Sequence, residues 1–130
     1  MNNFSECRSC YNHLGGFYAV EFFSDLLEHH YVFYIREPIF KNIHSKNPLL
    51  ITHKGIEFFK FLGEQVNSYG FAYACLDGTE KKPHLGGKIG GLVLKYLLNN
   101  KLAYKNNNNR CLRLTSTAKT ILTGKVNFNV

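Results

Sequence analysis

The chain repeats a short motif at long range. The sequence HLGG at positions 13–16 recurs at positions 84–87, which is 71 residues later. The sequence LLIT at 49–52 is answered by LRLT at 112–115, at the shorter offset of 63 residues. The first copy therefore carries eight more residues between its two apolar runs. A repeat of this length predicts two copies of one supersecondary unit, the first over residues 5–65 and the second over residues 66–125.

Composition restricts where such a chain can work. With 130 residues and 45% hydrophobic content, it is long enough for one compact domain. It contains no apolar run long enough for a membrane span and no signal peptide at the start. Four cysteines at this length, without a secretory signal, favour reduced thiols. We expect a cytoplasmic protein that does not contact a membrane.

Each copy has the pattern of a helix followed by two strands and a second helix. In the second copy, apolar residues at 89, 92, 93, 96 and 97 have helical spacing, and Thr115 or Ser116 can cap a later helix that ends near 122. Strands are expected at 102–104 and 112–114 around a turn at 106–109, whereas 69–76 is expected to be a helix end or a buried turn.

The first copy follows the same pattern. It predicts a helix over 17–27, strands at 31–35 and 49–51, and a helix over 54–62 capped by Thr52. The fold class expected is α+β. It would comprise two pseudo-repeated winged-helix units, each a helix-turn-helix plus a β-hairpin wing, packed as one compact domain.

Positive charge is concentrated in the second copy. Residues 1–65 hold six Lys or Arg and seven Asp or Glu, whereas residues 66–130 hold ten and two. This asymmetry favours an anionic partner for the second unit, and the alternative is an ordinary solvated exterior. Acidic residues at 21, 25 and 28 would repel phosphates from the first unit. The candidate contacts with double-stranded DNA are Lys88, Lys95, Lys101, Lys105, Arg110 and Arg113.

Cysteine and histidine residues occupy matching places in the two copies. Cys10 precedes His13 by three residues, and Cys75 precedes His84 by nine. If the copies pack about a pseudo-twofold axis, the two pairs would approach one another and could bind zinc tetrahedrally. Alternatively, the histidines cap helices or bond within the repeat interface, and the cysteines are small buried apolar residues.

Acidic residues beside the second pair form another candidate group. Asp77 and Glu80 could line a ligand pocket or join the two units in a polar network, and the alternative is a solvated loop. A general acid and base pair is conceivable there, but the sequence supplies no nucleophile beside an oriented base. We therefore do not expect an enzyme.

Two signatures resemble a known family. CYNHLGG at 10–16 and CLDGTEKKPHLGG at 75–87 are similar to the paired signatures of a subgroup of ArsR-type bacterial transcriptional regulators, and the similarity extends over about residues 5–123. The chain departs from the family pattern at Asn12, Gly78 and Ala118, where Asp, Trp and Gly are usual. In that family the signatures lie C-terminal to the DNA-binding winged helix. The resemblance therefore implies the C-terminal region of such a regulator.

The function expected is regulation or dimerisation within a bacterial winged-helix transcriptional regulator. The second unit would add an auxiliary contact to double-stranded DNA, and a homodimer is expected. Two alternatives remain open at this point. One is a domain that senses a metal or a small molecule, with zinc as the candidate cofactor, and the other is a protein-interaction scaffold that does not bind DNA.

Overall fold

The chain folds as two successive runs of the same kinds of element. The computed structural model describes residues 6–10, 12–106 and 109–124. The first run contains β1 (Arg8–Cys10), β2 (His13–Gly15), α2 (Phe17–Glu28), β3 (Val32–Tyr34), β4 (Lys46–Ile51), α3 (His53–Phe58) and the 3-10 helix η1 (Phe59–Leu62). The second contains β5 (Ala72–Leu76), β6 (Pro83–Gly86), α4 (Gly87–Asn99), β7 (Ala103–Lys105), β8 (Leu112–Leu114) and α5 (Ser116–Leu122).

The strands of the two runs pair with one another. Four antiparallel strands form one sheet in the order β3-β4-β5-β6, so that each run contributes one hairpin. The hairpins β1-β2 and β7-β8 are separate two-stranded sheets, but an isolated antiparallel bridge between Arg8 and Cys111 brings β1 alongside β8. Each run therefore places one of its hairpins next to a hairpin of the other run.

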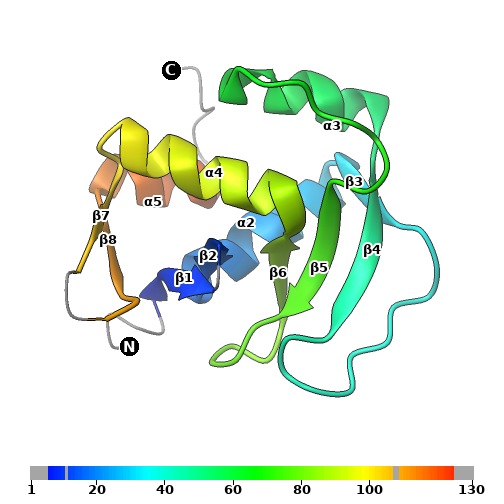
Figure 1. The fold of residues 1–130 in the computed structure, drawn as a ribbon, viewed down its shortest axis with the longest axis horizontal. Coiled ribbons are helices and arrows are strands. Elements are labelled where there is room, and N and C mark those ends of the chain that lie inside the picture. The colour runs from blue at the N-terminus through cyan, green and yellow to red at the C-terminus, as the bar shows by residue number, and fades with distance from the viewer. Residues whose placement is uncertain (1–5, 11, 107–108, 125–130) are drawn as a thin grey trace.

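Each of the two long helices packs against a strand of the other run. Helix α2 packs against β6, and α4 packs against β2. Figure 1 shows both helices between the four-stranded sheet at one end of the molecule and the β7-β8 hairpin at the other. Phe23 and Leu26 of α2 and Ile89 and Leu97 of α4 are at most 1% exposed. Burial of each such side chain stabilises the fold by about 1.5–3 kcal/mol. Helices and antiparallel sheets thus share one core, which confirms the expected α+β class.

Threonine side chains begin the two short helices. Thr52 Oγ1 accepts a hydrogen bond from the backbone N–H of Gly55 at 2.9 Å, and Thr115 Oγ1 accepts one from Ala118 at 3.1 Å. Each cap is worth about 1 kcal/mol because it satisfies a backbone donor that has no partner within the helix. Both predicted caps are confirmed, with Thr115 rather than Ser116 as the capping residue of α5.

Two expectations about individual elements differ from the structure. Residues 69–76 were expected to be a helix end or a buried turn, but 72–76 is the strand β5, which has β4 and β6 as its neighbours. A short apolar run is ambiguous in sequence, and pairing on both sides decides for a strand. The helix expected over 54–62 is α-helical only to Phe58 and continues as η1.

The order α4, β7, β8, α5 is the order that the wing pattern predicted. In the described residues, however, α4 directly follows the hairpin β5-β6, and α2 directly follows β1-β2, rather than a second helix. The winged-helix assignment and the internal repeat remain predictions. The turn predicted at 106–109 lies partly outside the described residues. No helix among those described combines the length and the apolar character that crossing a membrane requires.

Candidate metal centre

The Cys and His residues lie opposite each other on two hairpins. Cys10 pairs with His13 in the β1-β2 register, and Cys75 pairs with His84 in the β5-β6 register. Directly opposed residues of an antiparallel pair project from the same face of the sheet. Each hairpin therefore presents one thiol and one imidazole side by side, although the sequence spacings of the two pairs differ.

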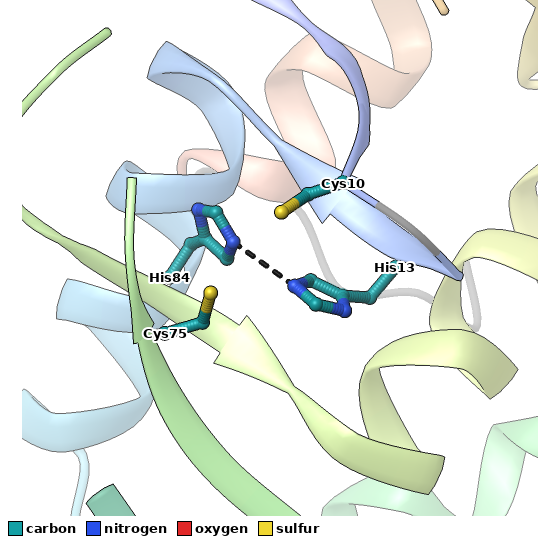
Figure 2. Close-up of side chains that lie close together, drawn as sticks. All are labelled: Cys10, His13, Cys75 and His84. Carbon is teal, nitrogen blue, oxygen red and sulfur yellow. Dashed lines mark hydrogen bonds between the residues drawn. The ribbon is translucent and has the colours of Figure 1, made fainter. Parts of the chain in front are cut away.

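The two hairpins bring all four side chains into one cluster. Figure 2 shows Cys10 and His13 facing Cys75 and His84. One potential ligand atom from each residue lies within 4.8 Å of every other, and Nε2 of His13 lies 3.0 Å from Nε2 of His84. Each of the four residues is at most 2% exposed. This is a closed site of two sulfur and two nitrogen donors, assembled from both runs of the chain.

Asp77 orients the His84 ring. The buried Oδ1 of Asp77 lies 2.8 Å from Nδ1 of His84, so that the ring donates this N–H and directs Nε2 at the cluster. The same oxygen accepts hydrogen bonds from Arg8 Nη2 at 3.0 Å and from the backbone N–H of Gly16 at 2.7 Å. A carboxylate behind a histidine is the usual outer partner of a metal-binding imidazole, because it selects the tautomer and orients the ring.

Charge in the cluster follows from these contacts. Burial raises the pKa of Asp77, but hydrogen bonds from His84 and from the backbone of Gly16 and Glu80, together with the charge of Arg8, outweigh burial, and the pKa lies well below its ordinary value. Burial lowers the pKa of His84, but the interactions with Asp77 and Cys10 together outweigh burial and raise the pKa above its ordinary value. Asp77 is therefore ionised, which makes the His84 ring more basic.

The two thiols influence each other in opposite directions. The hydrogen bond with Cys75 lowers the pKa of Cys10 far below its usual range despite burial. The same bond, together with burial, raises the pKa of Cys75. The pair thus holds one thiolate readily, and a thiolate is the form of cysteine that binds metals.

The spacing of the donors can be compared with a zinc site. Tetrahedral zinc, with Zn–N of about 2.1 Å and Zn–S of about 2.3 Å, places neighbouring ligand atoms roughly 3.3–3.8 Å apart. The 3.0 Å between the imidazole nitrogens and the 4.8 Å limit for the whole set span this range. The four donors therefore have separations of the order that one tetrahedral zinc ion requires.

Asp77 and Glu80, which the sequence offered as a pocket or inter-repeat network, have different surroundings. Asp77 joins Arg8 and Gly16 of the first run to His84 of the second. Glu80 donates its backbone N–H to Asp77 Oδ2 at 2.9 Å, and its carboxylate accepts from Thr79 Oγ1 at 3.3 Å. Of the two side chains, Asp77 is the one that connects the runs.

Two residues near the cluster were not anticipated. Arg8 is the buried cation that pairs with Asp77, and its Nη1 also donates to Thr79 Oγ1 at 3.0 Å. His44 places Nδ1 at 3.6 Å from Cys10 Sγ and 3.9 Å from Cys75 Sγ. No motif spacing connects His44 to the others. His44 lies among the residues by which the first copy is longer than the second, and this position was the sequence feature that could have drawn attention to it.

The predicted DNA-contact residues are all exposed. Lys88 and Lys95 lie on α4, and Lys88 Nζ is 4.9 Å from the centre of the Phe71 ring. Lys95 and Lys105 line a surface hollow together with Ser9 and Asn12. The remaining cations lie after α4 or on the β7-β8 hairpin: Lys101, Arg110 and Arg113.

Comparison with known proteins gives one informative relative. The chain is 27% identical over 128 residues to the uncharacterized HTH-type transcriptional regulator YdfF of Bacillus subtilis (strain 168). The match covers 95% of this chain and 52% of YdfF, so the chain spans about half the length of that relative. No family model and no solved structure matches. The similarity is thus to an HTH-type transcriptional regulator, and the ArsR type and the C-terminal placement remain predictions of the sequence.

Proposed function

We propose that this chain is a metal-responsive regulatory region of a bacterial transcriptional regulator. In this proposal, zinc or another thiophilic divalent ion binds Cys10, His13, Cys75 and His84. The observation that carries the proposal is the cluster itself, since two hairpins from separate runs of the chain bring two sulfurs and two imidazole nitrogens within 4.8 Å of one another. The similarity to an HTH-type regulator supports the regulatory setting.

The arrangement of the two imidazoles favours a cation between them. His84 donates its Nδ1 hydrogen to Asp77, so Nε2 of the neutral ring carries a lone pair. In the structure that lone pair accepts a hydrogen bond from Nε2 of His13 at 3.0 Å (Figure 2), and a bound ion would take the place of the shared hydrogen. A metal ion would accept both lone pairs together with the adjacent thiolates, and softer ligands of this kind select zinc over magnesium or calcium.

The closed character of the site favours a structural or regulatory ion over a catalytic one. Catalytic zinc sites keep one position for water or substrate, whereas structural sites supply four protein ligands. Here four buried protein donors would fill a tetrahedral ion. We infer that the chain is not an enzyme and that it works in the cytoplasm, where its free thiols would stay reduced.

Metal binding would link the two runs of the chain. The ion would join the β1-β2 hairpin to the β5-β6 hairpin, and these belong to different runs. Ligand binding of this kind becomes folding free energy when the site forms only in the folded chain. Loss of the ion would loosen this junction and so alter the dimerisation or the DNA contact of the regulator.

Metal content and cobalt spectroscopy test this proposal. We expect one zinc or cobalt ion per chain, sulfur-to-cobalt charge-transfer absorption, and the intense visible bands of four-coordinate Co²⁺. The variants Cys10→Ser and Cys75→Ser should lose these bands, whereas Cys111→Ser, which changes a thiol outside the cluster, should retain them. Absence of bound metal in the wild-type chain under reducing conditions, or full retention in Cys75→Ser, would contradict the proposal.

A second role, contact with duplex DNA, is supported by the exposure of all six predicted cations. Lys95 and Lys105 lie at one hollow, so phosphate oxygens could bind there. In this role the basic second run adds sequence-independent affinity to a regulator.

A further inference from the structure

His44 lies in the connection between β3 and β4, next to the proposed metal centre. Its backbone N–H donates to the carbonyl of Leu76 at 2.9 Å, and the N–H of Leu76 donates to the carbonyl of Ser45 at 3.1 Å. These bonds continue the pairing of β4 with β5, in which Lys46 is opposite Cys75. The end of the connection formed by residues 35–45 is therefore held beside one of the proposed ligands.

The backbone at His44 has an unusual conformation. Its φ is 66°, in the left-handed region that few residues other than glycine adopt. Histidine is among the residues found there more often than most. In this conformation the ring lies against both sulfurs, with Nδ1 at 3.6 Å from Cys10 Sγ and 3.9 Å from Cys75 Sγ.

His44 differs from the four proposed ligands in burial and in position. The ligands are buried, whereas His44 is only half-buried. Its nitrogen also lies outside the set of four donor atoms within 4.8 Å of one another. A tetrahedral ion bound by that set would have no further position for His44. The ring is instead placed to contact the sulfur side of the centre.

We propose that His44 donates its Nδ1 hydrogen to the metal-bound sulfurs of Cys10 and Cys75 and thereby couples metal occupancy to the connection at 35–45. This inference rests on the proposed function. An N–H···S bond withdraws charge from a thiolate and orients it, which is how outer partners adjust metal sites. Ile39 and Ile43 in this connection are 62% and 48% exposed. Metal occupancy would therefore change a surface that carries apolar side chains.

Two substitutions separate the hydrogen bond from the backbone conformation. His44→Gly removes the ring and accepts a positive φ without strain. His44→Asn also tolerates the left-handed region, and its amide nitrogen is bonded to Cγ, as Nδ1 is in histidine. Asparagine can therefore restore an N–H donor but is a poor zinc ligand. His53→Ala, an exposed histidine on α3, is the matched control.

The first measurement is the rate at which excess chelator removes zinc from the folded protein. We expect His44→Gly to release zinc about 10-fold faster or more, because changes of outer partners lower metal affinity by about 10–100-fold. His44→Asn and His53→Ala should stay close to wild type. The sulfur-to-cobalt absorption should shift in His44→Gly, while the visible bands keep the intensity of four-coordinate Co²⁺.

The second measurement is amide hydrogen exchange of residues 39–45 with and without metal. Metal should slow this exchange in the wild type and have a smaller effect in His44→Gly. Equal zinc release by wild type and His44→Gly would overturn the inference while leaving the metal site intact. Equal impairment of the Gly and Asn variants would also overturn it, because a restored N–H donor would then have no effect. A changed cobalt coordination number in His44→Gly would overturn it as well, because His44 would then be a ligand. A wild-type chain that binds no metal would overturn the proposed function itself.

Discussion

Asp77 and His84 share a buried hydrogen bond of 2.8 Å across the β5-β6 hairpin, and both side chains are fully buried. This bond determines which nitrogen of His84 faces Cys10, His13 and Cys75. Asp77 also binds Arg8 and the N–H of Gly16, which belong to the other run. One carboxylate therefore orients a proposed ligand and connects the two halves of the site.

Replacing Asp77 by Asn should weaken both the site and the fold. The substitution retains the size of the side chain but removes the negative charge that pairs with Arg8, and breaking a buried pair costs about 3–5 kcal/mol. Zinc affinity should fall by about 10–100-fold because His84 loses its anionic partner. Urea unfolding and competition with a chelator measure the two effects. Glu57→Gln, in an exposed pair with Lys60, is the control and should change stability by less than about 0.5 kcal/mol.

Gly90 permits the close approach of α4 to the site. A Cβ at this position would lie 2.7 Å from the backbone oxygen of Leu85 and 3.0 Å from His13 Cβ. Gly90→Ala should therefore destabilise the protein by about 1–3 kcal/mol through overpacking. It should also weaken metal binding through displacement of His13.

Whether Gly90→Ala lowers or raises the stability of the protein is the test. In an exposed helix the same substitution stabilises by about 1 kcal/mol. Gly78→Ala is the control, since the nearest atom to its Cβ would be Arg8 Nη2 at 3.6 Å. A rise in melting temperature for Gly90→Ala would show that α4 does not approach β6 and His13 this closely.

Cys7 should be unreactive in the native protein. Burial raises its pKa to about 12, and the residue is 1% exposed. The thiolate is the reactive form, so a short pulse of iodoacetamide at pH 8 should label Cys7 only after unfolding. Cys111, which is partly exposed, serves as the internal reference. Peptide mapping by mass spectrometry would contradict this expectation if both cysteines were labelled at the same rate.

Contact with DNA should depend on the hollow that Lys95 and Lys105 line. Fluorescence anisotropy on a random duplex should give affinity that falls steeply with salt. Each phosphate contact removed by alanine should reduce the salt slope by about 1. Lys54→Ala and Lys60→Ala, on exposed positions of the first run, should leave the slope unchanged. Lack of binding by the wild type at low salt would exclude the auxiliary contact.

Local features of the sequence predicted local features of the fold. The apolar spacing predicted the helices that the structure shows as α2 and α4, and Thr52 and Thr115 cap the helices that follow the return strands. Such features depend on a few neighbouring residues, because helical periodicity and capping involve contacts within one or two turns. The equivalent positions of the Cys and His pairs were likewise visible as a repeat.

Pairing across the chain was decided only in the tertiary structure. The sequence of 69–76 did not distinguish a strand from a helix end, and hydrogen bonding to β4 on one side and to β6 on the other made residues 72–76 the strand β5. The partnership of Arg8 with Asp77 and the approach of His44 to the sulfurs join residues far apart in sequence. These contacts form because buried polar groups require partners, wherever the folded backbone places them. The sequence by itself thus determined the long helices, the strands that follow them and the candidate ligands, whereas the two hairpins β1-β2 and β5-β6 that assemble those ligands into one site formed only through tertiary pairing.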